Sequence, residues 1–140
     1  MKNAVFIMFA ILIAACNSNK KVVKNNAGER VEIEAVDDST EYELIVFDPG
    51  YESFLITQPY PKNYYSNEYY KNWNIQYVTE WNYRYDHPDV YGDFYETRID
   101  YDPSIDYGLD FNYRLYQYFQ FIDKQYGIVL ISRRGKQRTR

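Results

Sequence analysis

Hydrophobic residues recur every three or four positions in two long stretches of the chain, a spacing that predicts two helices. The first covers about residues 66–86. It opens at Ser66 or Asn67 and ends before Pro88, because the residue preceding a proline avoids the helical region. The second covers about residues 106–126, with Asp106 as its cap and Gly127 as its end. Both apolar stripes are rich in aromatic residues: Tyr70, Trp73, Tyr77, Trp81 and Tyr85 in the first helix, and Phe111, Leu115, Phe119, Ile122 and Tyr126 in the second.

Two short apolar runs, residues 41–47 and 127–131, predict strands that are covered on both faces. We expect them to pair in a small sheet with both helices on one face, which is an α+β fold. Residues 31–35 alternate apolar and acidic positions and could add an edge strand. Asp48 is placed to cap a short helix, although residues 49–57 fit either a helical turn or a strand.

The chain begins with a different pattern. Lys2 is followed by an uninterrupted apolar run at residues 4–13, shorter than the ~20 residues that span a bilayer. Residues 13–16, Ile-Ala-Ala-Cys, complete the layout of a secretory signal and resemble the lipobox of bacterial lipoproteins. The resemblance implies cleavage before Cys16, the sole cysteine, and lipidation of its thiol. The alternative is an ordinary secreted protein with an unmodified cysteine.

Charge and composition divide the chain into four parts. These are a lipoprotein signal peptide (1–15), the lipidated cysteine with a flexible tether (16–40), a globular domain (41–131) and a basic, disordered tail (132–140). The domain holds six basic and fifteen acidic residues, net −9, while the tail holds five basic residues and no acidic one. We expect the tail to contact anionic lipid heads or the acidic domain, or to remain a solvated end. Nucleic acid is not an expected partner of a secreted lipoprotein.

Aromatic residues supply the candidate contact surface. Most of the eighteen tyrosines fall on helix stripes or strand alternations, where a core requires them. Trp73 and Trp81, eight residues apart, would form a paired stacking platform if their shared helix face met solvent. The better candidates for contact are the tyrosines in loops: Tyr60, Tyr64, Tyr65, Tyr91 and Tyr95.

Residues suited to catalysis are sparse. His87 is the sole histidine and stands at a helix end, where we assign it to the terminal carbonyls. Sequence motifs of serine hydrolases, zinc proteases and phosphate-binding loops do not occur. The remaining arrangement is the carboxylate pair of glycosidases, for which Glu80 and Glu96 are candidates. We therefore expect no cofactor and assign no catalytic residue.

Three aspartates echo the start of a calcium-binding loop. Together with Ser104, the aspartates Asp100, Asp102 and Asp106 supply side-chain oxygens at alternate positions, and hard cations require several such oxygens within a short loop. However, Ile105 and Phe111 occupy the positions where that loop needs glycine and glutamate. The alternative is an Asp-Pro turn followed by an Asp-capped helix. We therefore expect no metal site.

The longer pattern resembles a known family. The stretches that carry the resemblance are "YELIVFDPGYESFLITQ", "YYKNWNIQYVTEWNYR", "YGDFYETRIDYDPSIDYGLDFNYRLYQYFQF" and "YGIVL". Together, over about residues 41–131, they resemble a family of small uncharacterised lipoproteins of Bacteroidota, classified as a domain of unknown function. The resemblance implies a place in the cell envelope and no particular activity. The residues after Cys16 lack the acidic run linked to surface display in such bacteria, which favours an outer-membrane protein facing the periplasm.

Two hypotheses for function follow. The first is a membrane-anchored envelope lipoprotein, a non-catalytic binding or scaffold module whose partner is another envelope protein. It predicts an exposed aromatic patch. The alternative is a glycan- or peptidoglycan-binding domain, or a hydrolase that uses a carboxylate pair. It predicts a cleft lined by tyrosine or tryptophan with two convergent carboxylates.

Overall fold

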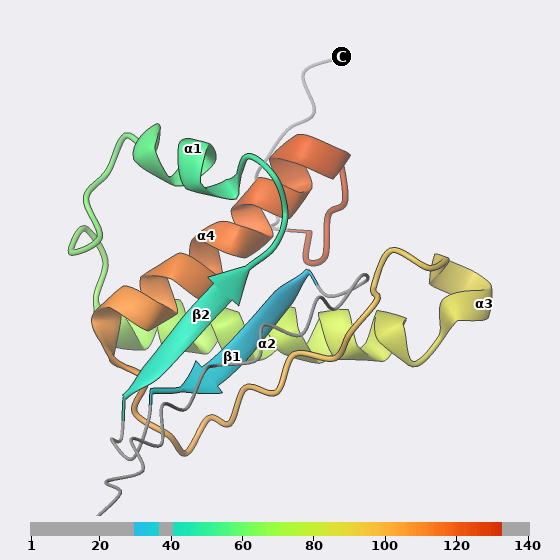
Figure 1. The fold of residues 1–140 in the computed structure, drawn as a ribbon, viewed down its shortest axis with the longest axis horizontal. Coiled ribbons are helices and arrows are strands. Elements are labelled where there is room, and N and C mark those ends of the chain that lie inside the picture. Colours follow the sequence, from blue (N-terminus) through green and yellow to red (C-terminus); the bar gives the residue numbers. More distant parts are fainter. Residues whose placement is uncertain (1–29, 37–40, 133–140) are drawn as a thin grey trace, which may run out of the picture.

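The computed structural model describes residues 30–36 and 41–132. In this part of the chain lie two strands and four helices, listed in chain order: β1 (Val31–Ala35), β2 (Tyr42–Val46), α1 (Tyr51–Ile56), α2 (Asn67–Tyr85), α3 (Pro88–Tyr91) and α4 (Gly108–Tyr126) (Figure 1). The predicted α+β class is confirmed. The signal peptide, the lipobox with Cys16 and residues 133–140 of the basic tail lie outside the described residues.

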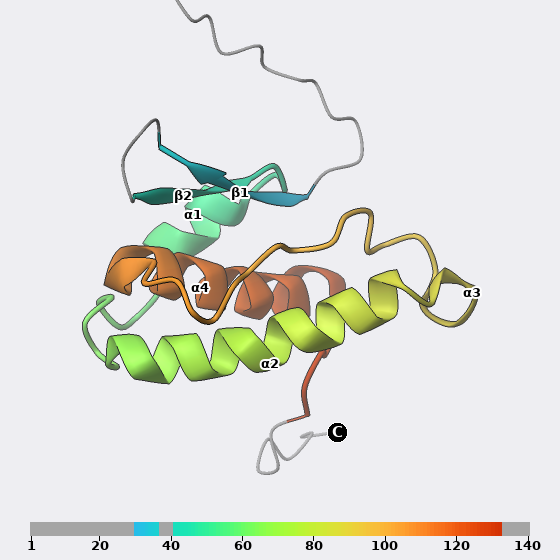
Figure 2. The same ribbon diagram turned by 90° about the horizontal axis from the view of Figure 1, so that it is seen from below.

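The elements are stacked in layers. Figure 2 shows the two-stranded sheet on one side, α4 with α1 beneath it, and α2 on the far side. Helix α4 contacts β2, α1 and α2, so it is the central element of the fold. No helix among residues 30–36 and 41–132 has both the length and the apolar character needed to cross a membrane.

The two long helices lie where their periodicity predicted. Ser66 is the N-cap of α2, and its hydroxyl accepts a hydrogen bond from the Tyr69 amide at 3.2 Å. Gly127 ends α4 in the left-handed conformation with φ 68°, which glycine adopts without steric cost. At the start of α4, Asp106 accepts a bond from the Gly108 amide at 3.1 Å, but the N-cap position belongs to Tyr107.

Helix α4 is buried on more than the one face that its stripe predicted. Residues 115–119 are all buried, and five consecutive positions cover more than a full helical turn. The sheet covers one side of the helix and α2 the other. Tyr126, the last member of the predicted stripe, is instead 39% exposed.

The sheet is a hairpin of β1 and β2 in antiparallel register. Val31 lies opposite Val46 and Ile33 opposite Leu44. These apolar pairs share one face of the sheet, and Val31 and Leu44 are buried in the core. The alternate positions of β1 are Glu32 and Glu34, so the predicted edge strand at residues 31–35 is confirmed. Folded structure therefore begins about ten residues before the predicted boundary at residue 41, within the stretch assigned to the tether.

The predicted strand at residues 127–131 is wrong. This segment has no strand structure and does not pair with β2, whose neighbour in the sheet is β1. The hairpin partner is close in sequence, and closing a short loop costs little entropy. The segment is held by Arg84, whose Nη2 donates to the carbonyls of Val129 and Leu130 at 3.1 and 3.2 Å. Leu130 is buried, so the apolar run reflects packing on the core.

The ambiguous stretch after β2 is helical. Residues 51–56 form α1, but its N-cap is Gly50, with φ 88°, and not Asp48. The Asp48 side chain points into the core and makes contacts there that are described below. The capping prediction is therefore wrong for Asp48.

Candidate functional site

Five aromatic side chains form a continuous series from the α1–α2 connection onto the first turns of α2. We call them the tyrosine ladder: Tyr60, Tyr64, Tyr65, Tyr69 and Trp73. The rings of Tyr60 and Tyr64 stack with centroids 4.3 Å apart, and those of Tyr65 and Tyr69 stack at 4.1 Å. The two stacks meet edge-on, with Tyr64 and Tyr65 at 4.7 Å and 84°. Trp73 continues the series edge-on from Tyr69 at 6.5 Å.

Local structure holds the ladder in place. Pro59 and Pro61 restrict the backbone of the connection, and the Tyr64 amide closes a turn onto the Pro61 carbonyl at 2.9 Å. The Ser66 cap then starts α2 directly after the ladder's loop residues. Lys62 forms an exposed ion pair with Asp110 of α4 at 2.7 Å. Such a pair contributes little free energy, but it ties the loop to the central helix.

The outer part of the ladder faces solvent. Tyr60, Tyr64 and Tyr65 are 55, 52 and 40% exposed, whereas Tyr69 and Trp73 are half-buried. Partial desolvation of the Tyr65 phenol, together with the neighbouring Tyr69, Tyr64 and Tyr60 side chains, raises the pKa of Tyr65. The Tyr65 phenol therefore remains a neutral hydrogen-bonding group at physiological pH. The ladder combines exposed aromatic faces with hydroxyl donors and acceptors.

The structure separates the other predicted contact residues from the ladder. Trp81 is fully buried, and its indole Nε1 donates to the Thr97 carbonyl at 2.8 Å, so a solvent-facing pair of Trp73 and Trp81 is wrong. Tyr95 is also buried and packs edge-on against Trp81 at 5.0 Å. Tyr91 is 37% exposed but lies in α3, next to the guanidinium of Arg84.

Tyr69 is the ladder residue that the apolar periodicity does not predict, because it lies outside the apolar stripe of α2. The available signal was its spacing: Tyr65, Tyr69 and Trp73 recur at every fourth position, which places them side by side on a helix. Tyr60 and Tyr64 join them through the fold of a loop, which periodicity does not describe.

The aspartates of the calcium-like stretch serve local backbone structure. Asp102 Oδ1 accepts bonds from the Ser104 hydroxyl at 2.7 Å and the Ser104 amide at 2.8 Å, and these two bonds lower the pKa of Asp102. Asp106 binds the Gly108 amide at the start of α4, and Asp100 is exposed. Within the described ranges, no group of three or more histidine, cysteine, aspartate or glutamate side chains is arranged to hold a metal ion.

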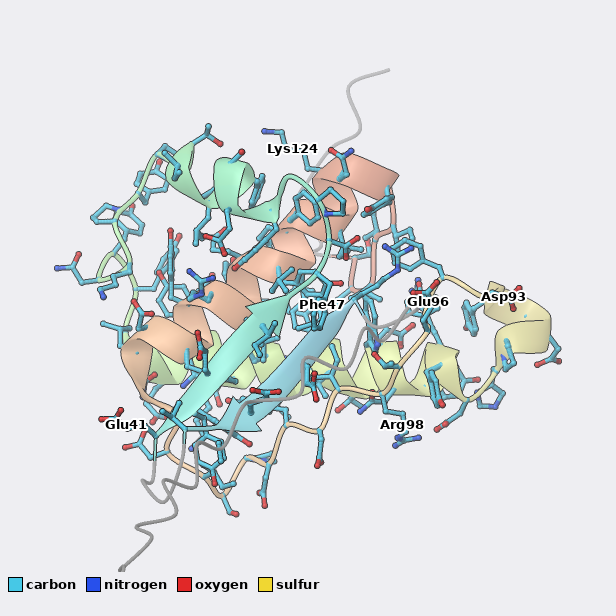
Figure 3. All side chains as sticks on the ribbon, in the orientation of Figure 1. Glu41, Phe47, Asp93, Glu96, Arg98 and Lys124 are labelled. Carbon is cyan, nitrogen blue, oxygen red and sulfur yellow. The ribbon has the colours of Figure 1, made fainter. Side chains whose placement is uncertain are left out.

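The two glutamates considered for hydrolysis face different arginines. Glu80 accepts a bond from Arg84 Nε at 2.7 Å on α2. Glu96 lies on the segment after α3 and comes within 3.9 Å of Arg30 Nε (Figure 3). His87 makes the predicted contact with a terminal carbonyl, since its Nδ1 lies 2.7 Å from the backbone carbonyl oxygen of Tyr83.

An acidic groove lies beside the start of α4. It has a volume of about 520 Å³ and runs between β2 and the first turns of the helix. Figure 3 labels Glu41 at this end of the sheet, opposite the end that carries Phe47. The carboxylates that line the groove are Glu41, Glu43, Asp106 and Asp110. Arg114 also lines the groove, so four carboxylates face one guanidinium and the lining is net negative.

A network centred on the buried carboxylate of Asp48 joins four segments of the chain at the opposite end of the sheet. Asp48 accepts bonds from Arg30 Nη1 at 2.6 Å, from the Tyr118 hydroxyl at 2.7 Å and from the Tyr126 hydroxyl at 2.8 Å. The side chain of Asp48 is only 3% exposed. Arg30 also donates from Nε to the Phe94 carbonyl at 3.0 Å and lies 4.0 Å from that ring's centroid. This network serves the fold and lies away from the ladder.

Buried tyrosines should make the domain sensitive to alkali. Burial raises the pKa of Tyr118 and Tyr51, and for Tyr118 the charge of Asp48 adds to the effect. A tyrosine in the unfolded chain ionises near pH ~10. Above that pH the unfolded state binds fewer protons than the folded state, so the free energy of unfolding should fall as pH rises, by up to ~1.4 kcal/mol per pH unit for each such group.

Denaturant unfolding at a series of pH values, followed together with tyrosinate absorbance, measures this effect. Tyr118→Phe should reduce the slope of stability against pH above pH ~10, because it removes one of the buried tyrosines whose pKa is raised in the folded state. Full ionisation of all tyrosines near that pH in a chain that stays folded would contradict the prediction.

Comparison with known proteins adds one result. No curated protein and no solved structure matches this sequence. A family model matches residues 4–134, and these include every described strand and helix. The predicted resemblance to a domain of unknown function is confirmed at that level. The chain belongs to the family of unknown function DUF6146.

Proposed function

We propose that this protein is a membrane-anchored envelope lipoprotein whose domain is a non-catalytic binding module, with the tyrosine ladder as its contact surface. The observation that carries the proposal is the ladder itself: three exposed tyrosines held in defined stacks at the end of a long helix. Pre-ordered aromatic side chains lose little entropy on binding and dominate interface energetics.

The anchor is proposed from the sequence. Cys16 ends a lipobox-like stretch, and Arg30 is the first residue of the described fold. The fourteen peptide links between them would let the domain stand up to about 50 Å from the membrane if fully extended. We place the protein at the outer membrane, facing the periplasm.

Binding fits the geometry better than hydrolysis. The hydrolase alternative needs two carboxylates converging on an aromatic cleft. Glu80 and Glu96 are directed to Arg84 and Arg30, and the ladder has Lys62 and Asp110 beside it as an ion pair. The carboxylates of the acidic groove do lie beside Tyr42 and Tyr107, and one of them, Asp110, is paired with Lys62. No pair of carboxylates at the described ladder is arranged as hydrolysis requires.

Substitution of Cys16 by serine tests the anchor. We expect the wild-type protein in a Gram-negative host to fractionate with membranes and to carry an acyl mass increment on Cys16. The variant should lose that increment and keep its signal peptide, because lipidation precedes cleavage in this class of protein. A wild-type chain recovered from the soluble fraction with an unmodified amino end would overturn the anchor.

Photo-crosslinking in living cells tests the contact surface. A photoreactive phenylalanine analogue at Tyr64 should give a partner adduct. The same analogue at Tyr83, a 49% exposed tyrosine near the other end of α2, should not. Adducts that are equally abundant at both positions, or found only at Tyr83, would remove the ladder as the contact surface.

A further inference from the structure

The ladder is close to neutral in a strongly acidic domain. Residues 58–73 contain Lys62, Lys71 and Glu68, net +1, while residues 41–131 carry −9. Lys62 is moreover paired with Asp110. An anionic partner would meet the repulsion of the whole domain, and a cationic partner would meet Lys62 and Lys71 at the ladder itself. Charge therefore favours an uncharged partner at the ladder.

Besides these few charged residues, uncharged hydrogen-bonding groups surround the rings. Each ladder tyrosine carries a hydroxyl that donates and accepts. Asn63 lies between the exposed rings in sequence, Asn72 lies next to Trp73, and both residues are exposed. An aromatic face with amides and hydroxyls at its margin matches a pyranose, whose C–H faces are apolar and whose edge is a ring of hydroxyls.

The arrangement of rings suits a chain of sugars better than a single one. The two stacks, Tyr60–Tyr64 and Tyr65–Tyr69, lie nearly at right angles. They therefore present two separate aromatic surfaces along the loop, while Trp73 extends the series along α2. Successive units of a polymer can occupy such surfaces in turn, and binding then gains from their linkage.

We propose that the tyrosine ladder binds a neutral polysaccharide strand by stacking of its sugar rings on the exposed tyrosine faces. This inference rests on the proposed function, whose contact surface it assigns to one class of ligand. It requires no bond to be made or broken.

Affinity electrophoresis of the full-length lipoprotein in non-ionic detergent tests the proposal. The native gels contain a soluble β-glucan, a mannan or glycol chitin as neutral polymers, or alginate as an anionic polymer. We expect at least one neutral polymer to retard the protein, alginate not to do so, and high salt to leave the retardation unchanged. Tyr60→Ala and Tyr65→Ala should each weaken the affinity about tenfold, which corresponds to about 1.4 kcal/mol, because each removes one aromatic contact with the sugar.

Two controls distinguish a loss of binding from a loss of folding. Tyr83→Ala removes a tyrosine that is as exposed as those of the ladder and should bind as the wild type does. Tyr60→Ala lies in a loop at 55% exposure, so its thermal unfolding should match that of the wild type even if Tyr65→Ala is less stable.

The outcomes separate the inference from the function on which it rests. The glycan assignment is overturned if no neutral polymer retards the protein, or if the ladder variants are retarded as much as the wild type. If the glycan assignment fails in this way but Tyr64 crosslinks to a protein in cells, the binding module stands with a protein partner. If Tyr64 crosslinks to nothing and no polymer retards the chain, the contact surface itself is wrong.

Discussion

Replacement of Asp48 by alanine is expected to lower the free energy of unfolding by about 3–5 kcal/mol, the usual cost of removing one partner from a buried ion pair. The loss has two parts. The Arg30 guanidinium, with a side chain only 20% exposed, would keep its charge without its carboxylate. The Tyr118 hydroxyl, on a side chain with no exposed surface, would be left without its acceptor. Chemical denaturation followed by circular dichroism measures the change.

A matched control uses an exposed carboxylate. Asp93→Ala removes an aspartate at the surface near α3 and should change stability by no more than about 0.5 kcal/mol (Figure 3). A double-mutant cycle of Asp48→Ala with Arg30→Met should show that the two losses are not additive, because they remove one shared interaction. A loss for Asp48→Ala as small as that of the control would show that the buried network does not stabilise the fold.

Replacement of Trp81 by alanine is expected to cost about 3–5 kcal/mol, as for other large aromatic residues in a core. The indole has no exposed surface and packs against Tyr95 at 5.0 Å and Tyr118 at 5.9 Å. It also binds the Thr97 carbonyl, which fastens the extended segment after α3 to α2. Trp81→Phe should retain much of the packing but leave that carbonyl without its donor, at a cost of about 1–3 kcal/mol.

The other tryptophan provides the comparison. Trp73→Ala should cost less than Trp81→Ala, since Trp73 is only half-buried at the end of the ladder. Trp73→Ala should instead reduce the retardation of the protein by the polymer in the affinity gels. If Trp81→Ala left stability unchanged and abolished binding, the assignment of Trp81 to the core would be wrong.

Local periodicity was enough to place the two long helices. Ser66 and Gly127 mark their ends in the sequence because a capping hydroxyl and a left-handed glycine act within one turn of the backbone. The same local reasoning failed for residues 127–131. An apolar run records burial but not the manner of burial, and Arg84 of α2 holds this run against the core without strand pairing.

The candidate site was predictable only in part. Tyr64 and Tyr65 were singled out because a loop has no core to fill, and both are exposed in the ladder. Tyr95 satisfied the same criterion, yet it is buried against Trp81. Whether a loop tyrosine faces solvent depends on which helix the loop crosses, and that information is not local.

The sequence by itself determined the elements whose causes lie within a few residues: two aromatic helices, the strand at residues 42–46, and the concentration of acidic charge in the domain. The tertiary structure decided which aromatic rings are exposed, which strands pair and what Asp48 binds. The partners of Asp48 lie 18, 70 and 78 residues away in the chain. Contacts over such separations depend on how α4 is packed between the sheet and α2, and no local pattern of residues specifies that packing.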